Sequence, residues 1–286
     1  MKRHELVRPD TIIRYWAGGH DAGPALVLLH GATLDHRSWQ AQVTALRSRY
    51  RVVVPDLRAH GESRVEGPFA FGAAVDDVVA LLDALELDHL AIVGLSLGGN
   101  IAQEIVHRDP ARAAALVVAD STCNTSARHP WQTSMAIATL AGLGMVGREL
   151  FLHATAHATA QHADVQRYVL EMNAVRSTQA TLQILRAMLD EALHPDPAYR
   201  LPIPTLLMHG DGDQFGDIVA GTKAWADSEP LAEYLTIPRA RHVSNQDNPE
   251  VFNAALISFL ERTLPPVGTR NARPVVLGAG HAATAG

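Results

Sequence analysis

Short, continuous apolar runs recur along the chain, and they constrain its fold more than any other feature. The clearest is Ala25-Leu26-Val27-Leu28-Leu29, in which successive side chains are all apolar, as in a strand buried on both faces of a sheet. Similar runs span residues 51–55, 89–93, 114–119 and 204–208. Segments with helical spacing lie between them, at residues 38–47, 73–85 and 97–107. This alternation predicts an α/β fold with a mostly parallel, doubly wound sheet.

The alternation is interrupted once, which divides the expected core into two parts, residues 1–121 and residues 201–264. Residues 122–200 have helical or irregular spacing, so we expect them to form a helical cap inserted into the core. Residues 265–286 are rich in Gly, Ala and Pro without periodicity, which predicts a disordered tail. The other elements expected in the core are strands at 4–8, 11–17 and 232–237, and helices at 220–226 and 249–263.

The composition is that of a globular protein. Of the 286 residues, 47% are apolar and 19% are charged, so the chain can bury a full sheet with helices on both faces. The net charge of −6, without any Lys/Arg cluster, argues against a nucleic-acid-binding surface. Cys123 is the only cysteine, which fits a reducing compartment. Because the sequence has no visible signal peptide and no apolar run of membrane-spanning length, we expect a cytoplasmic protein without membrane contacts.

The strongest functional signal is the stretch Gly94-Leu95-Ser96-Leu97-Gly98-Gly99, which contains the pattern G-x-S-x-G. It follows an expected strand directly and opens an expected helix, which is the context that this motif requires. Gly94 and Gly98 allow strand and helix to pass closely, and the turn lifts the Ser96 hydroxyl clear of the sheet. The motif predicts that Ser96 is a nucleophile.

A serine hydroxyl needs a base, and His242 is the histidine in the expected place. The chain has 15 histidines, so only position can select one. His242 follows the expected strand at 232–237 and precedes the last helix, where the base falls in the chain order Ser, acid, His. For the acid we favour Asp213, because it lies farther out in the loop after the strand at 204–208. Asp211 and Asp120 are the alternatives.

The predicted chemistry also needs hydrogen-bond donors for an oxyanion. One expected donor is the backbone N–H of Leu97, the residue after the nucleophile. The other is the N–H of Ala32, in the loop that begins with His30-Gly31. We expect His30 to shape this loop rather than to act as a second base.

These motifs together resemble the α/β-hydrolase superfamily, in its esterase, perhydrolase and enol-lactonase branch. The matching segments extend from about residue 25 to 262 and are His30-Gly31 with Trp39, residues 56–63, Gly94–Gly99, residues 209–213 and residues 242–249. The resemblance implies structural roles for Asp56 and His60. The chain departs from the family at Ala59 and Arg241, where glycine is usual. Arg241 either shapes the mouth of the site, or binds an acidic group of the substrate, or is a solvated surface residue.

The resemblance implies a serine hydrolase that cleaves a carboxylic ester or lactone of a small molecule through a Ser-His-Asp triad. It implies no cofactor and no metal. The alternatives are a C–C bond hydrolase or lyase-like enzyme on the same fold, and a non-catalytic small-molecule receptor. The substrate and the oligomeric state stay open.

Several residues of the expected cap and its surroundings have less specific interpretations. We expect His153 and His157 to be polar surface residues rather than metal ligands, because no matching carboxylate pattern accompanies them. Cys123 is expected to be a small buried residue rather than a reactive thiol. Trp131, Met135 and Met145 either line an acyl pocket or pack against the core.

Overall fold

The computed structural model describes residues 1–126, 138–139, 142 and 145–264 of the chain. The predicted tail and the cap residues Trp131 and Met135 lie outside the described residues. Within them, the strands are β1 (Lys2–Arg8), β2 (Thr11–Gly19), β3 (Ala25–Leu29), β4 (Arg51–Pro55), β5 (Arg64–Val65), β6 (Leu90–Leu95), β7 (Ala113–Ala119), β8 (Thr205–Gly210) and β9 (Ala232–Ile237). The helices are η1 (His36–Trp39), α1 (Gln40–Leu46), α2 (Phe71–Ala84), α3 (Leu97–Arg108), η2 (Pro110–Arg112), α5 (Arg148–Thr159), α6 (Ala163–Ala174), α7 (Thr178–Glu191), α8 (Ile218–Ser228), α9 (Ser244–Asp247) and α10 (Pro249–Thr263).

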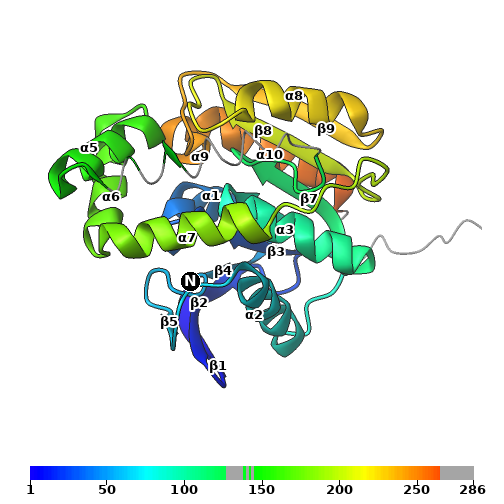
Figure 1. Ribbon diagram of the computed structural model, residues 1–286. Coiled ribbons are helices and arrows are strands. Elements are labelled where there is room, and N and C mark those ends of the chain that lie inside the picture. Colours follow the sequence, from blue (N-terminus) through cyan, green and yellow to red (C-terminus); the bar gives the residue numbers. More distant parts are fainter. Residues whose placement is uncertain (127–137, 140–141, 143–144, 265–286) are drawn as a thin grey trace, which may run out of the picture.

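The strands form one central sheet in the order β1-β2-β4-β3-β6-β7-β8-β9 (Figure 1). The pairs β1–β2 and β2–β4 are antiparallel, and short β5 pairs with β2. From β4 to β9 every neighbouring pair is parallel. The expected α/β fold with a mostly parallel, doubly wound sheet is therefore confirmed.

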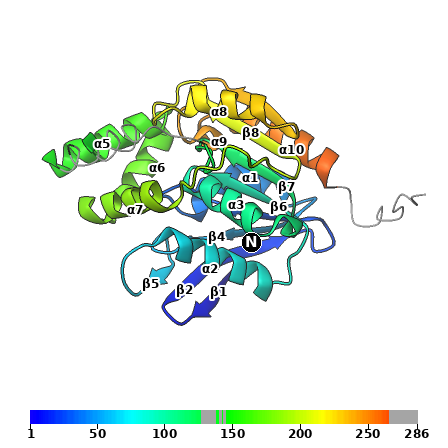
Figure 2. The same ribbon diagram turned by 45° about the vertical axis from the view of Figure 1, so that its right-hand side comes forward.

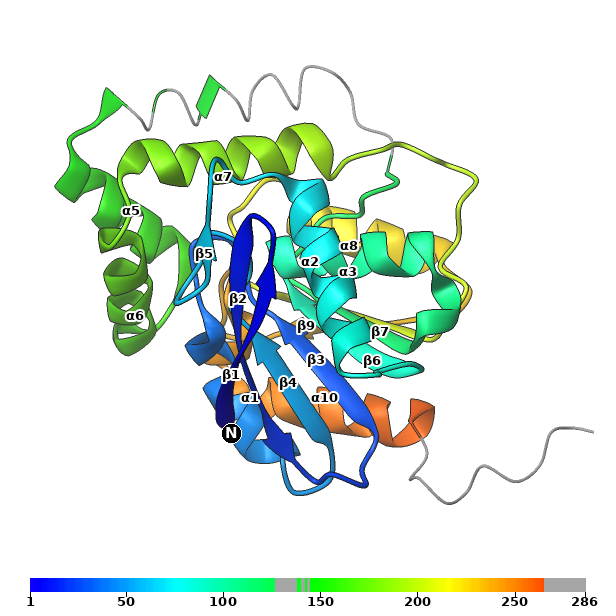
Figure 3. The same cartoon turned by 90° about the horizontal axis from the view of Figure 1, so that it is seen from below.

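Helices cover both faces of the sheet and enclose two apolar clusters (Figure 3). Alternate residues of each strand belong to different clusters, as the pleat requires: Leu26 and Leu28 pack with α1 and α10, and Val27 and Leu29 with α2 and α3. The fully apolar runs of the sequence follow from this burial on both faces. The carboxyl ends of the parallel strands then meet at one edge, where the candidate site lies.

Among the described residues, the chain between β7 and β8 forms helices and irregular connections and no strand. Helices α5, α6 and α7 lie together at one end of the molecule (Figures 1 and 2). They contact the core through the loop after β3 and the segment after β9, for example where Tyr168 donates to Asp35 at 2.9 Å. The division into a core of residues 1–121 and 201–264 and a cap of residues 122–200 stays a proposal. Among the described helices, none has the length and apolar character needed to cross a bilayer.

Candidate active site

Ser96 lies on a sharp turn between β6 and α3, with φ 51° and ψ −118°. A positive φ is rare for a residue with a side chain and indicates backbone strain. The flanking glycines are sterically required, since a Cβ on Gly94 would lie 2.2 Å from the carbonyl oxygen of Gly98. A Cβ on Gly98 would lie 2.1 Å from the carbonyl oxygen of Leu29. The strand and helix can approach this closely only because both positions lack side chains.

The imidazole of His242 lies between Ser96 and Asp213. Its Nε2 is 2.8 Å from the Ser96 hydroxyl, and its Nδ1 is 2.9 Å from Asp213 Oδ2. The other oxygen of Asp213 accepts a hydrogen bond from the Phe215 N–H, which fixes the carboxylate. The structure therefore brings together three residues that the sequence placed on three separate loops, in the arrangement of a nucleophile, a base and an orienting acid.

The two competing aspartates contact other groups. Asp211 accepts a hydrogen bond from the Ala240 N–H and so joins its loop to the segment that precedes His242. Asp120, at the end of β7, is fully buried and accepts from the Gly210 N–H and from both the N–H and the hydroxyl of Ser244. Both residues support the loops from which Asp213 and His242 extend, but neither contacts the His242 ring.

The charges around His242 favour its protonated form. Burial by itself lowers the pKa of His242, but the charge and hydrogen bond of Asp213, together with the charge of Asp120, outweigh it and raise the pKa above 6.5. Burial raises the pKa of Asp120 to about 7, and the negative charge of Asp213 adds to this effect. The ring is thus poised to accept a proton from a nearby hydroxyl.

The loop after β3 lies against the candidate nucleophile. A Cβ on Gly31 would be 3.4 Å from the Cβ of Ser96, so Gly31, the residue before Ala32, lies close to the nucleophile position. The N–H of Leu97 is in the first turn of α3, where a helix leaves its N–H groups without internal partners. Within the described residues, neither N–H makes a hydrogen bond to the backbone of a neighbouring segment. Their role as oxyanion donors therefore stays a prediction.

Buried polar side chains shape this loop. His30 accepts the Leu57 N–H at Nε2 and donates from Nδ1 to the Gly31 carbonyl, which agrees with the structural role expected for it. Asp56 accepts hydrogen bonds from the backbone N–H groups of His36 and Glu62, and therefore braces two loops. These contacts are those of structural residues and leave no lone pair of His30 for a substrate.

Arg176, between α6 and α7, makes a contact with the core that no sequence pattern predicts. Its guanidinium donates to the carbonyl oxygen of Thr33 at 3.0 Å and to that of Ala59 at 3.0 Å. It thereby joins the proposed cap to the residue next to Ala32. No motif surrounds Arg176 in the sequence, and its role depends on a contact across 143 residues.

Arg241 has contacts that disagree with two of its three interpretations, the solvated residue and the ligand of an acidic group. Its guanidinium donates to the backbone carbonyl oxygens of His157 and Ala160, at the C-terminal end of α5. A cation is favourable there because the helix end carries partial negative charge. Arg241 is therefore neither a solvated surface residue nor free to bind an acidic group, and it ties the His242 segment to α5.

The remaining candidates lie outside this constellation. His153 and His157 are exposed on α5, as expected of polar surface residues. Burial raises the pKa of the half-buried Cys123, which disfavours the reactive thiolate. Met145 is 85% exposed and so packs against no core residue among those described.

The comparisons with known proteins agree with this fold. The alpha/beta hydrolase family model matches residues 26–255, so the chain belongs to this family of hydrolases. It is 25% identical to 3-oxoadipate enol-lactonase 2 of Acinetobacter baylyi, over 90% of this chain and 96% of that protein. It is 28% identical to a pimeloyl-[acyl-carrier protein] methyl ester esterase of Nitrosospira multiformis, over 83% of this chain and 94% of that protein. The solved structure of an esterase from Thermogutta terrifontis has a TM-score of 0.77 at 24% identity, covering 92% of this chain and all of that one, and supports the fold.

Proposed function

We propose that this chain is a serine hydrolase that cleaves a carboxylic ester or lactone of a small molecule, with Ser96 as nucleophile, His242 as base and Asp213 as orienting acid. The observation that carries the proposal is the position of the His242 ring, within 2.9 Å of both Ser96 and Asp213. The names of the relatives, an enol-lactonase and a methyl ester esterase, support this substrate class.

The reaction proceeds in two steps. In the first, the Ser96 oxygen attacks the substrate carbonyl while His242 Nε2 takes the hydroxyl proton. The N–H groups of Leu97 and Ala32 stabilise the oxyanion. His242 then gives the proton to the leaving alcohol, or to the ring oxygen of a lactone, and an acyl-enzyme remains. In the second step His242 removes a proton from water, whose oxygen attacks the acyl carbonyl. The bond to Ser96 then breaks, the carboxylic acid leaves, and His242 returns the proton to the Ser96 oxygen. Asp213 stabilises the imidazolium formed in both steps.

The test is labelling with a fluorophosphonate, followed by intact-mass measurement. We expect one adduct on the wild type and on the surface control Ser258→Ala, and none on Ser96→Ala. Turnover of a p-nitrophenyl ester by Ser96→Ala should fall by about 10⁴-fold or more, while its circular dichroism stays that of the wild type. An adduct on Ser96→Ala would contradict the assignment of the nucleophile.

The same experiment separates the alternatives. Absence of an adduct on a folded wild type would favour the non-catalytic receptor, because no activated serine would then exist. If Ser96 is labelled, a panel of esters, lactones and β-diketones separates the proposed reaction from C–C bond cleavage, which uses the same triad. Faster turnover of the diketones would overturn the ester or lactone assignment.

A further inference from the structure

Three side chains with metal-binding atoms converge at a place that the proposed reaction does not use. Glu104 and His107 are three residues apart on α3, and therefore lie on one face of that helix. His194 comes from the connection between α7 and β8. One ligand atom from each lies within 4.8 Å of the other two. Glu104 is eight residues beyond Ser96, which corresponds to about 12 Å along the helix axis.

The position of His194 is fixed by the backbone. Its N–H donates to the carbonyl oxygen of Asn124, and the N–H of Asp196 donates to that of Thr125. The connection that leaves β7 and the connection that returns to β8 therefore run side by side. The side chain of Gln103, on α3, accepts the Asn124 N–H at 2.9 Å and holds the connection that leaves β7 against the helix.

The carboxylate of Glu104 is oriented for a shared ligand. Its Oε1 accepts a hydrogen bond from Arg108 at 2.7 Å, and its Oε2 lies 2.8 Å from His194 Nε2. Arg108 therefore holds the carboxylate through one oxygen, while the other oxygen faces the imidazole nitrogen. A hydrogen-bonded carboxylate of this kind is typical of metal ligands, whose orientation depends on such outer partners.

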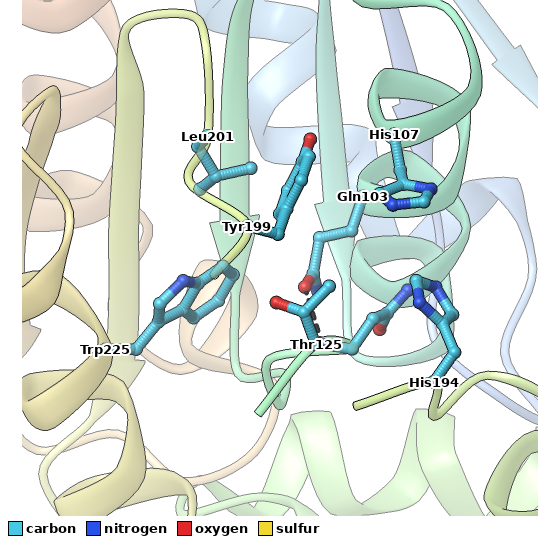
Figure 4. A pocket seen from close by; sticks show the side chains of 8 residues that line it. Gln103, His107, Thr125, His194, Tyr199, Leu201 and Trp225 are labelled. Carbon is cyan, nitrogen blue, oxygen red and sulfur yellow. Dashed lines mark hydrogen bonds between the residues drawn. The ribbon is translucent and has the colours of Figure 1, made fainter. Parts of the chain in front are cut away.

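The two imidazole rings are also close, with centroids 4.9 Å apart, and His107 lies 4.7 Å from the ring of Tyr199. Figure 4 shows His107 and His194 on one side of a small cavity, with Tyr199 between them and Trp225. The cavity has a volume of about 10 Å³, enough for one water molecule. Within the described residues, the buried Tyr199 hydroxyl makes no hydrogen bond.

We propose that Glu104, His107 and His194 bind one divalent transition-metal ion, with Zn²⁺ as the best match. Two imidazoles and a carboxylate are ligands that Zn²⁺ accepts, and a site with three protein ligands keeps a fourth position for water. In a tetrahedral site the ligand atoms are roughly 3.3 Å apart. Glu104 Oε2 and His194 Nε2, now 2.8 Å apart, must separate slightly to admit the ion, and His107, whose ligand atom lies within 4.8 Å of theirs, completes the site. The ion replaces the hydrogen bond between Glu104 and His194, and the proton of His194 moves to Nδ1.

The proposed ion joins α3 to the connection that returns from the cap, across a loop of 86 residues between His107 and His194. Because the ligands converge only in the folded chain, binding stabilises the folded state. The site is independent of Ser96, and Ser96→Ala should bind the ion as the wild type does.

The test is calorimetric titration of the metal-free full chain with Zn²⁺. We expect one ion per chain in the wild type, and an affinity weaker by about 10- to 100-fold or more in His107→Gln and in His194→Gln. Glu104→Gln keeps a hydrogen bond to His194 but loses the charge, and should also weaken binding. Thermal unfolding should shift upward with Zn²⁺ in the wild type and not in His194→Gln.

A matched control is the double variant His153→Gln/His157→Gln, which removes the exposed i,i+4 pair on α5. Two exposed histidines at this spacing test whether Zn²⁺ binds to surface imidazoles in general. Unchanged binding by the control supports the proposal. Loss of binding in the control, or no saturable binding by the wild type, would overturn it.

Discussion

At the scale of single residues, the charge state of His242 governs the proposed chemistry. As a base the imidazole must be neutral, yet Asp213 favours its protonated form and raises its pKa above 6.5. Activity should therefore be lost as the pH falls through this raised pKa, so the acidic limb lies at higher pH than an ordinary histidine would give. Without Asp213, the desolvation of the ring would dominate and lower the pKa.

We predict that Asp213→Asn moves the pKa of His242 downward, whereas Asp211→Asn leaves it unchanged. Asp211 is two residues away, but its carboxylate contacts the Ala240 N–H instead of the ring. The measurement is NMR titration of the His242 imidazole, which does not depend on turnover. The acidic limb of kcat/KM in the wild type should have the same midpoint as the titration. Equal pKa values in Asp213→Asn and the wild type would contradict the proposed electrostatics.

At the scale of elements, helices of the proposed cap form hydrogen bonds with the loops that contain the proposed site residues. Arg176 fixes the Thr33 carbonyl next to Ala32, and Asp247 accepts hydrogen bonds from the N–H groups of Gln161 and His162 at the start of α6. The loop after β3 and the segment that carries His242 are therefore both bonded to the same group of helices. A cap contact can therefore alter catalysis without touching the substrate.

We predict that Arg176→Met lowers kcat for a p-nitrophenyl ester by about 10- to 100-fold with a smaller change in KM, because Ala32 loses its fixed position. Arg176→Lys should recover only part of the loss, since one ammonium cannot reproduce two directed contacts. Arg148→Met is the matched control, because Arg148 donates to Ala174 and Arg176 carbonyls on the exposed side of the same turn. An equal effect of Arg148→Met would contradict a positioning role.

At the scale of the whole molecule, the last helix completes the layer on one face of the sheet. Phe252 of α10 is fully buried, and its ring lies 6.2 Å from that of Trp39 in η1. These residues are more than 200 positions apart in the sequence, so this cluster forms only when both ends of the core assemble. Its packing supports the loop of His242, which is joined to α10 through the short helix α9.

We predict that Phe252→Ala lowers the free energy of unfolding by about 3–5 kcal/mol, because it leaves a cavity in a fully packed region. Leu231→Ala, at a position that is 49% exposed, should change it by less than about 0.5 kcal/mol. Urea denaturation measures both, and the midpoint should move without a change in slope. A small loss of unfolding free energy in Phe252→Ala would contradict the role of α10 in completing this layer.

Local patterns predicted most of the core but not the ends of its strands. The sequence indicated a strand ending at Met208, whereas β8 continues to Gly210 because His209 and Gly210 pair with Thr236 and Ile237 of β9. In the same way β2 continues to Gly19, opposite Arg51. Strand ends depend on the partner strand, which apolar periodicity does not reveal. The two-residue strand β5 is too short to have a pattern.

The sequence by itself determined the α/β class, the sharp turn at Ser96 and the candidate positions of base and acid, because each depends on neighbours within a few residues. The choice of Asp213 over Asp120 rests on distances to the His242 ring, which exist only after three loops meet. Tertiary structure alone decided the contacts of Arg176 and Arg241 and the approach of His194 to Glu104. These contacts join residues about 80 or more positions apart, and only packing of the chain brings such residues together.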